Sequence, residues 1–341
     1  MKYGYVTLLS SENYLPGVVA LARSLKATGT KVPFECVCSK DLDEKVVTRL
    51  HQYGVATSRL AKSATEGLEI PNSAEFSHWK YTFDKLLLWR VGGVRFDKVV
   101  FLDSDMMIAS NIDFLFERPD FSACQAGHFL NPDWVRLNSG LMVIEPNAET
   151  FKGLMAQLPL TLKKYAAEGK NVGDQDVIND FVPDWSSRED LHLPEELNMF
   201  FKNLTLVKAS GFSFDAADAE KKISVVHFIG AEKPWHLHGI KRLLYPLKVV
   251  LKNRYGFSAF LQYMKLIKSV RNMNHQVVLL LTGCVQPNIK NDVLAIKDVE
   301  TRKNQYLEAI DWYIKNTPYK IVFCENSGYD LKSEMEIRGA N

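Results

Sequence analysis

Short apolar runs alternate with helical patterns along the first fifty residues, and this alternation is the feature that most constrains the fold. The runs YGYVTLL and VPFECVCS are typical of strands, and each is followed by a segment with helical spacing, at residues 15–28 and 41–54. Strand–helix–strand units joined in this way form parallel sheets that are covered by helices. The sequence therefore predicts an α/β fold with a mixed, mainly parallel sheet.

The alternation continues along the rest of the chain. FDKLLLWRVGG and ETFKGLMAQLPLTLKKYAAEG predict helices, DKVVFL and SGLMVIEP predict buried strands, and KISVVHFIG predicts a late strand. Near the C-terminus, QVVLLLTGC, VETRKNQYLEAIDWYIKN and YKIVFCEN predict one β-α-β unit. Roughly 65 residues are too few for a complete doubly wound domain, so we expect a small C-terminal piece beside one large domain.

Charge is distributed unevenly along the chain. The formal net charge is +2, yet the segment from Lys233 to Lys290 contains ten Lys or Arg residues and no Asp or Glu. Within it, KRLLYPLKVVLKNRYGFSAFLQYMKLIKSVR interleaves apolar and basic residues. This pattern is typical of a helix that contacts anionic lipid headgroups and equally of a solvated helix pair that covers the core. No nucleic-acid partner is expected, since no known binding module accompanies the charge.

Cysteine usage and hydropathy bear on the compartment. The five cysteines are odd in number and scattered, which is typical of a reducing environment. Cys36 and Cys38 lack a second Cys or His pair at ligand spacing, so no zinc site is expected. No apolar run reaches the roughly 20 residues that cross a bilayer, and the N-terminus lacks a secretory signal pattern. We expect a cytoplasmic location, with the inner face of a membrane as the alternative raised by the basic segment.

Two carboxylates, Asp103 and Asp105, follow the apolar run KVVFL. Ligands of open α/β sheets bind beyond the carboxyl ends of the strands, so this pair is placed where it can reach a ligand. The same Asp-x-Asp spacing recurs at residues 41–43 and 174–176, and spacing alone therefore carries little weight. The motif at 41–43 begins a polar helix, where helix capping explains it. We interpret Asp103 and Asp105 as metal ligands, against the alternative of a capped strand end.

A second polar group follows the late strand, in HFIGAEKPW. His227 ends the strand, Gly230 allows the backbone to turn, and Lys233 supplies a positive charge before a rigid Pro-Trp pair. A divalent cation and a lysine together offset the charge of a pyrophosphate leaving group. A histidine at a strand end is more often structural, but its combination with Asp103 and Asp105 favours a metal site. Two carboxylates and one imidazole favour Mn²⁺, with Mg²⁺ as the alternative.

Six segments, in order, resemble the family 8 retaining glycosyltransferases, the group of glycogenin and galactinol synthase. They are VTLLSSENYLPG, the FDKLLLW helix, VVFLDSDMMIASNIDFLFE, LNSGLMVIEP, GDQDVIN and HFIGAEKPW, and they cover about residues 2–238. The resemblance implies a GT-A fold, a Rossmann-like fold that binds nucleotide sugars, over residues 1–240. Residues 241–272 would then form a basic amphipathic helical segment, and residues 273–341 a partial α/β unit of unknown role.

The resemblance also implies a reaction and a role for individual residues. The reaction is manganese-dependent transfer of glucose or galactose from UDP-glucose or UDP-galactose to an acceptor hydroxyl. Asp103, Asp105 and His227 would hold the manganese, and Asn138, Asp174 and Gln175 would lie at the sugar and its reacting carbon. The implied donor contacts are Leu8, Leu9, Ser10, Tyr14, Lys85, Ser104, Ser139, Gly230 and Lys233. Taken alone, Tyr14 reads better as a core aromatic and Lys85 as a solvated helix charge.

One position departs from the family pattern. The family often has a further acid three residues before the Asp of its Asp-Gln pair, and this chain has Asn171 there. An amide cannot act as the nucleophile, so Asp174 is the better candidate for facing the anomeric carbon. It would act as a transient nucleophile or as a stabiliser of an oxocarbenium-like state during front-face attack. The resemblance implies retention of the α-configuration in either case.

The sequence contains no pattern that identifies the acceptor, and several functions stay open. We expect a surface polysaccharide or lipid-linked glycan, with peripheral membrane contact as an option; the main alternative is glycogenin-like self-glucosylation. A catalytically silent protein that binds UDP-sugars is a third reading. A phosphatase is the weakest, because such enzymes place the strand and Asp-x-Asp near the N-terminus and usually follow them with Gly-Thr, whereas Met106 and Met107 follow here. The oligomeric state is not predicted.

Overall fold

The computed structural model describes residues 1–128, 130–230, 233–236, 245–246, 248–249, 253–272, 278–286, 298–316 and 320–337. These residues form two compact units, Met1–Lys268 and Ser269–Asn341. The first unit contains every predicted site residue. The division into segments 1–240, 241–272 and 273–341 stays a prediction.

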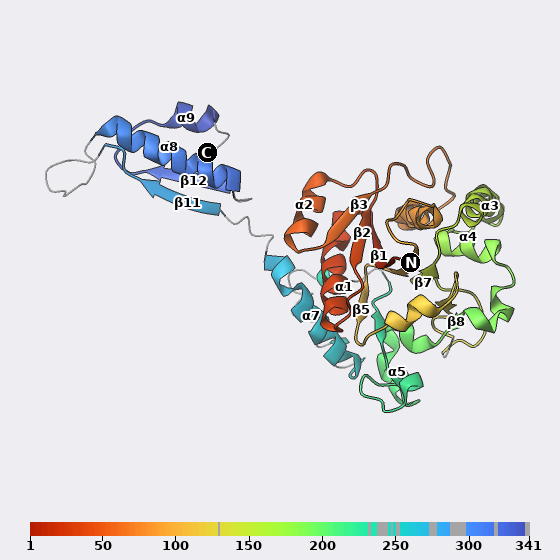
Figure 1. Ribbon diagram of the computed structural model, residues 1–341. Helices are drawn as coiled ribbons and strands as arrows, with labels where there is room; N and C mark the ends of the chain where they lie inside the picture. The colour runs from red at the N-terminus through yellow and green to blue at the C-terminus, as the bar shows by residue number, and fades with distance from the viewer. Residues whose placement is uncertain are drawn as a thin grey trace. The chain divides into compact units, whose positions relative to one another are not determined.

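A seven-stranded mixed sheet lies at the centre of the first unit (Figure 1), in the order β3-β2-β1-β4-β7-β6-β8. The first four strands of this order are parallel, β7 is antiparallel to β4 and to β6, and β8 is parallel to β6. The strands are β1 (Tyr3–Leu9), β2 (Phe34–Cys38), β3 (Ala56–Arg59), β4 (Lys98–Leu102), β6 (Ala123–Cys124), β7 (Leu141–Ile144) and β8 (His192–Leu193). The predicted fold class is confirmed.

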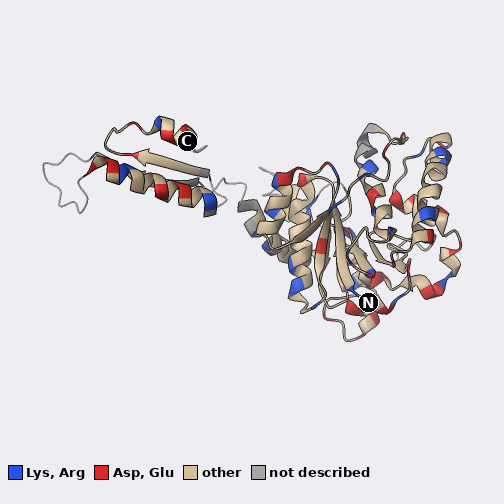
Figure 2. Cartoon of the chain, turned by 45° about the horizontal axis from the view of Figure 1, so that its top comes forward, with Lys and Arg blue, Asp and Glu red and all other residues tan. Residues whose placement is uncertain are grey.

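Helices cover both faces of this sheet. Core clusters join one face to η2, α3 and α4, and the opposite face to α1. Because both faces are covered, all five residues of β4 are buried, which explains the continuous apolar run from Val99 to Leu102. The main described helices of the first unit are α1 (Leu15–Ala27), α2 (Glu44–Gln52), the 3-10 helix η2 (Ala74–Trp89), α3 (Ala148–Ala167), α4 (Asp174–Phe181) and α5 (Leu204–Lys208); α7 (Gly256–Asn272) follows, and the unit ends within it at Lys268. In Figure 2 the charged residues lie mainly on helices and loops, and the central strands are largely tan.

The helix predicted at FDKLLLW forms as the end of η2, and it is a 3-10 helix. A repeat of three residues per turn stacks Phe83, Leu86 and Trp89 in one row, and all three are fully buried. The same repeat brings Lys85 inward, where it is 4% exposed. The reading of Lys85 as a solvated helix charge is therefore wrong.

A second, three-stranded sheet adjoins the carboxyl end of β4, in the order β5-β10-β9. Its strands are β5 (Met106–Ile108), β9 (Met199–Phe200) and β10 (Val225–His227). In the antiparallel pairing of β10 with β5, His227 lies opposite Met106. This register places the histidine next to the end of the Asp103–Asp105 segment.

The described part of the basic stretch packs its apolar face inward. Ala259, Phe260, Tyr263 and Ile267 of α7 are buried in a cluster with β9, β10 and α5. Leu261, at 44% exposure, is a large apolar residue of this helix on its outer side. The core-covering interpretation therefore holds for α7, while residues 237–244, 247, 250–252, 273–277 and 287–290 of the stretch lie outside the described residues.

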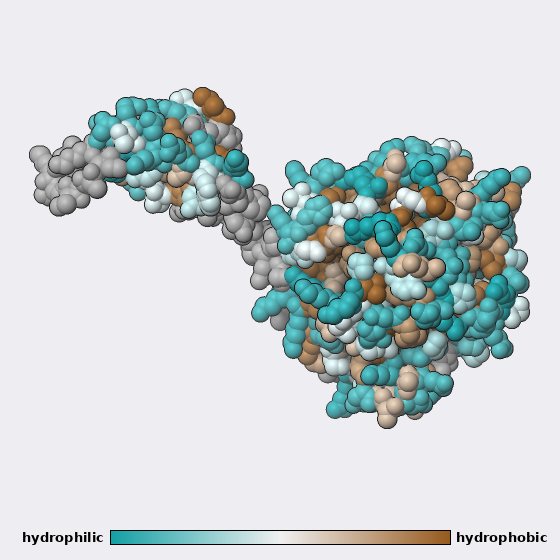
Figure 3. Space-filling model, viewed as in Figure 1, coloured by the Kyte–Doolittle hydropathy of each residue, from teal (hydrophilic) through white to brown (hydrophobic). Residues whose placement is uncertain are grey.

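The second unit contains the predicted β-α-β arrangement. Strands β11 (Val278–Gly283) and β12 (Lys320–Glu325) are parallel, and α8 (Val299–Asn316) connects them in the chain, followed by α9 (Lys332–Ile337). Its small core contains Val285, Ile310, Leu331 and Met335. Among the described residues, no helix combines the length and the hydropathy that a membrane span requires. On the face in Figure 3, apolar residues of the first unit are scattered among hydrophilic ones.

Candidate active site

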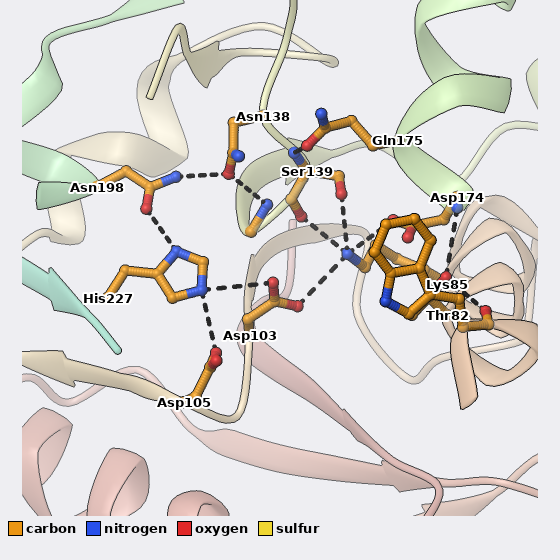
Figure 4. A network of polar contacts seen from close by, with 12 residues as sticks. Thr82, Lys85, Asp103, Asp105, Asn138, Ser139, Asp174, Gln175, Asn198 and His227 are labelled. Carbon is orange, nitrogen blue, oxygen red and sulfur yellow. Dashed lines mark hydrogen bonds and ion pairs between the residues drawn. The ribbon is translucent and has the colours of Figure 1, made fainter. Parts of the chain in front are cut away.

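Asp103, Asp105 and His227 converge at the carboxyl end of β4 (Figure 4). His227 Nε2 lies 3.1 Å from Asp105 Oδ1 and 3.9 Å from Asp103 Oδ2. One ligand atom from each residue lies within 4.8 Å of the other two. The two acids come from the turn between β4 and β5, and the histidine comes from β10, more than a hundred residues later in the chain. The convergence of Asp103, Asp105 and His227 that the metal-site prediction requires is therefore present.

A chain of side-chain amides orients the His227 ring. His227 Nδ1 lies 2.8 Å from Asn198 Oδ1, and Asn198 Nδ2 donates to Asn138 Oδ1 at 2.8 Å. Asn138 Oδ1 also accepts from Gly140 N at 3.0 Å. Because an amide oxygen accepts, Nδ1 carries a proton, and Nε2 is the ring nitrogen that faces the two carboxylates. Sequence reasoning missed Asn198, because it lies in ELNMF without a spacing signal and reaches the histidine only through the β9–β10 pairing.

The space between these ligands is kept open by Gly140. A Cβ atom at this position would lie 2.8 Å from His227 Cε1 and 3.1 Å from Asp103 Oδ2. Two carboxylates and one oriented imidazole, with room left between them, are a donor set that suits Mn²⁺ and related divalent cations. The residues present therefore fit a divalent ion, and the identity of that ion belongs to the proposal below.

Lys233 reaches the same group from the loop after β10. Its side chain is 4% exposed, and its Nζ donates to Phe228 O at 2.8 Å and forms an ion pair with Asp105 Oδ2. Burial acts to raise the pKa of the Asp105 carboxyl, but the adjacent His227 and Lys233 outweigh it, and its pKa lies below the ordinary value. Asp105 is therefore ionised, as a metal ligand must be.

A second buried lysine joins Asp103 to the other predicted catalytic carboxylate. Lys85 Nζ lies 2.8 Å from Asp174 Oδ2 and 3.4 Å from Asp103 Oδ1, and it donates to Ser139 O at 3.0 Å. Burial acts to lower the pKa of Lys85, but the two carboxylates outweigh it and raise the pKa. Desolvation raises the pKa of Asp103, with Lys85 opposing the shift. Lys85 thus holds the two halves of the site together.

Asp174 is the first residue of α4, and its neighbour Asp176 holds that end of the helix. Asp176 Oδ2 accepts from Gly173 N at 3.0 Å, and Tyr165 Oη donates to Asp176 Oδ1 at 2.8 Å. Asp174 N donates to Thr82 Oγ1 at 3.3 Å, so its carboxylate is directed toward Lys85. Anionic side chains are favoured at helix N-termini. Asp174 therefore belongs to the site, whereas Asp176 is a helix-capping residue.

Gln175 and Ser139 complete this side of the site. Gln175 Oε1 accepts from Ser139 N at 3.1 Å, and the Ser139 hydroxyl lies 3.2 Å from Lys85 Nζ. Asn171, which was excluded as a nucleophile, accepts from Ser73 N at 2.9 Å through Oδ1. The structure therefore brings Asn138, Ser139, Asp174 and Gln175 to the same polar network as the three metal-ligand candidates.

The predicted nucleotide contacts lie at the end of β1 and beside the Lys233 loop. Tyr14 makes an edge contact with Trp235 at 5.8 Å, and Lys233 Nζ lies 5.8 Å from the Tyr14 ring centroid. Leu9 is fully buried, while Leu8 and Ser10 are partly buried. The structure does not test whether these residues contact a nucleotide.

Two backbone features shape this region. Gly230 has φ +98°, a conformation that favours glycine and turns the chain after β10. A Cβ at Gly17 would lie 2.3 Å from Ser104 O, so α1 approaches the segment between the two acids closely. Trp235 Nε1 donates to Asn13 O at 2.7 Å and fixes the loop of Lys233 beside α1.

The remaining Asp-x-Asp motif is structural. Asp43 caps α2, and its side chain accepts from Lys45 N at 2.8 Å. This matches the expected capping role. It also provides a natural control for the motif at Asp103 and Asp105.

The fold and the site define a class of protein. A seven-stranded mixed sheet with an Asp-x-Asp turn at the carboxyl end of its central strand is the arrangement of a GT-A glycosyltransferase. The chain is similar to the solved galactosyltransferase LgtC in complex with donor and acceptor sugar analogues, with a TM-score of 0.50 and 16% identity, over 78% of this chain and 95% of that one. At this identity the likeness shows the fold.

Sequence comparison gives the family. The model of glycosyl transferase family 8 matches residues 5–239, and the chain belongs to this family. It is 33% identical over 241 residues to glycogenin-1 of Caenorhabditis elegans, covering 69% of this chain and 51% of that protein. It is 31% identical over 244 residues to a putative UDP-glucuronate:xylan α-glucuronosyltransferase 5 of Arabidopsis thaliana, covering 70% of this chain and 37% of the relative. The matched region thus spans about half of the former and less of the latter.

The family resemblance found in the sequence is confirmed. The phosphatase reading loses its support. The donor sugar, the metal and the acceptor are not decided by these comparisons.

Proposed function

We propose that this protein is a manganese-dependent, retaining glycosyltransferase that moves glucose or galactose from a UDP-sugar to a hydroxyl of a glycan or lipid-linked acceptor. One observation carries the proposal. The ligand atoms of Asp103, Asp105 and His227 lie within 4.8 Å of one another, and a buried Lys233 pairs with Asp105 at the same place. Cationic and metal-ligating groups gathered at one point suit a diphosphate leaving group.

The residues of the chain have distinct parts in this reaction. A divalent ion bound here supplies charge stabilisation for the departing UDP. Lys233 adds a positive charge that is already desolvated and needs little reorganisation. The positive φ of Gly230 lets the backbone turn where the diphosphate is expected. Leu8, Leu9, Ser10, Tyr14 and Ser104 form the nucleotide side of the proposed site.

On the sugar side, Asp174 faces the anomeric carbon. Lys85 holds its carboxylate at 2.8 Å, and Gln175 is held by Ser139. Asp174 acts as a transient nucleophile or stabilises the oxocarbenium-like state while the acceptor hydroxyl attacks from the face that UDP leaves. In both routes the C1–O bond to UDP breaks, a C1–O bond to the acceptor forms, and the acceptor proton passes to a phosphate oxygen of UDP; in the nucleophilic route a C1–O bond to Asp174 forms and then breaks in between. Product of retained α-configuration is expected by NMR.

A UDP-release screen tests the function directly. UDP-glucose, UDP-galactose and UDP-N-acetylglucosamine are incubated with Mn²⁺, with Mg²⁺ or with a chelator, and with glycan acceptors. UDP-glucuronate is added because a relative carries that donor in its name. We expect release from glucose or galactose donors with Mn²⁺. Binding of a donor without UDP release under any acceptor supports the catalytically silent alternative.

A matched pair of variants tests whether activity depends on the Asp-x-Asp motif of the proposed site and not on the same motif elsewhere in the chain. Asp103→Asn removes a metal-ligand candidate, and Asp43→Asn changes the same motif at a helix cap. We expect UDP release to fall at least about a hundredfold in the first variant, as is typical when a charge-stabilising group is lost. The second variant keeps its activity. Equal activities in the two variants contradict the proposal.

A second candidate function is self-glucosylation, favoured by the 33% identity to glycogenin-1. Intact-mass spectrometry after incubation with UDP-glucose and Mn²⁺ distinguishes the two. A hexose ladder on the protein itself supports this alternative and contradicts the surface-glycan acceptor. The proposed membrane contact has limited support, because the apolar face of α7 is already buried in the protein.

A further inference from the structure

A cavity of about 490 Å³ lies at the C-terminal half of α4 and shares no residue with the metal-ligand group. Its walls come from α3, α4 and the segments 135–136 and 182–186; α3 and α4 adjoin each other in Figure 1. The volume falls within the range of about 300–1,000 Å³ that is typical of small-molecule sites. None of the functions assigned above uses this cavity.

The polar lining favours a neutral ligand. Arg136 and Lys164 are the cations of the lining, and each already faces a carboxylate. Lys164 Nζ lies 2.9 Å from Asp180 Oδ1, and Arg136 Nη2 lies 3.3 Å from Asp176 Oδ1. An anionic ligand would have to compete with these carboxylates. Paired ions still present donors and acceptors to hydroxyl groups.

Apolar surface lies beside these polar groups. Val135 is 44% exposed, and Pro183 and Trp185 also line the cavity. Trp185 is 1% exposed and its Nε1 donates to Phe121 O at 2.9 Å, so it forms the floor of the cavity, and Val135 and Pro183 supply the apolar surface. A lining that combines hydrogen-bonding side chains with apolar surface matches the alternation of hydroxyl groups and C–H faces on a sugar ring.

The cavity is connected to the reaction centre through α4. Asn179 lines the cavity, and its Nδ2 donates to Gln175 O at 2.8 Å and to Leu137 O at 3.0 Å. Gln175 of the site and Asn179 are four residues apart, so they lie on the same face of this helix, about 6 Å apart along its axis at 1.5 Å per residue. A chain molecule with one unit beside Gln175 is therefore close enough to extend along this face toward the cavity.

We infer that this cavity binds a neutral oligosaccharide, the part of the acceptor or product glycan that does not react. The inference rests on the proposed function, because a glycan-modifying enzyme gains from holding the chain that it extends. Remote contacts of this kind position the attacking hydroxyl and raise its effective concentration. The site takes hexose units through Arg136, Gln157 and Lys164, with Val135 against a ring face.

Two variants and two matched controls test the inference on the full chain. Lys164→Met removes a polar lining group, and Val135→Arg fills the apolar edge. Lys163→Met changes the neighbouring lysine, which lines a different groove, and Val91→Arg changes another exposed valine, at 62% exposure. The probes are neutral malto-, galacto- and xylo-oligosaccharides, with binding measured by calorimetry and UDP release measured separately without acceptor.

We expect one of these series to bind the wild-type protein. Lys164→Met should raise its Kd about tenfold, as for loss of one hydrogen bond to a charged group. Val135→Arg should raise the Kd by a similar factor, because the longer side chain fills the apolar edge. The controls should change the Kd less than twofold. UDP release without acceptor should stay equal in all five proteins. No binding by any series, or equal loss in the control variants, overturns the inference. If oligosaccharides bind as expected and no donor releases UDP, the proposed function fails and the cavity remains a glycan-binding site.

Discussion

Replacing Lys85 by methionine should destabilise the first unit strongly, because its ammonium is buried between two carboxylates. Its Nζ lies 2.8 Å from Asp174 Oδ2 and 3.4 Å from Asp103 Oδ1. At an effective dielectric constant of 20 each attraction has a gross value of about 5 kcal/mol, and desolvation offsets part of it. Removing one partner of a buried pair typically costs about 3–5 kcal/mol, because a charge is left uncompensated. We expect Lys85→Met to lose stability in this range at neutral pH.

The assay should report on the first unit alone, since the chain has two units. Native-state hydrogen exchange of peptides covering β4 and β7 gives the opening free energy of their sheet. A chelator in the buffer removes any contribution from bound metal. Lys80→Met is the matched control, because Lys80 is an exposed lysine on the same 3-10 helix. Its effect should stay within about 0.5 kcal/mol.

Two further measurements make the result specific. Asp174→Asn in the Lys85→Met background should recover part of the loss, and the double-mutant cycle should give a coupling of about 0.5–3 kcal/mol. The deficit of Lys85→Met should also shrink as the pH falls toward 4, because protonation neutralises the uncompensated carboxylates. A Lys85→Met variant no less stable than Lys80→Met would refute the reasoning.

Three shorter predictions concern the surrounding structure. Asn198→Ala should weaken Mn²⁺ binding about 10- to 100-fold in a direct titration, because the ligand histidine loses its orientation; unchanged affinity contradicts the amide relay. Burial raises the pKa of Asp120 to about 7, so the native state retains a proton that the unfolded chain releases near pH 4, and stability should fall between about pH 4 and 7 by at most about 1.4 kcal/mol per pH unit. Asp120→Asn should remove this slope in pH-dependent denaturation. Gly17→Ala should cost about 1–3 kcal/mol in urea unfolding, because its Cβ would lie 2.3 Å from Ser104 O and 3.1 Å from Trp235; a neutral effect contradicts the close approach of α1.

The strands and helices of the first unit were predictable because their signals are local. The buried run at β4, the capped helix beginning after Asp43 and the glycine that follows α1 depend on periodicity and capping within a few residues. The 3-10 character of η2 was not predicted, since the FDKLLLW pattern is compatible with either repeat. The burial of Phe83, Leu86 and Trp89, which are three positions apart, fits the 3-10 repeat.

Only part of the candidate site could be predicted from the sequence. Asp174 and Asp176 have the same spacing as Asp103 and Asp105, and spacing alone cannot assign their roles. The structure places Asp174 on Lys85 and Asp176 on its own helix end. The difference arises because the side chain at the first position of α4 reaches Lys85, while the third reaches back to the helix cap.

By itself the sequence determined the α/β class, the family and the three metal-ligand candidates, since each rests on residues that are close together or on motifs in a set order. Only the tertiary structure decided that Asn198 orients His227, that Lys85 joins Asp103 to Asp174, and that a polar cavity lies along α4. These contacts join segments separated by tens of residues. Strand register and helix packing bring them together, and neither is encoded in any one segment.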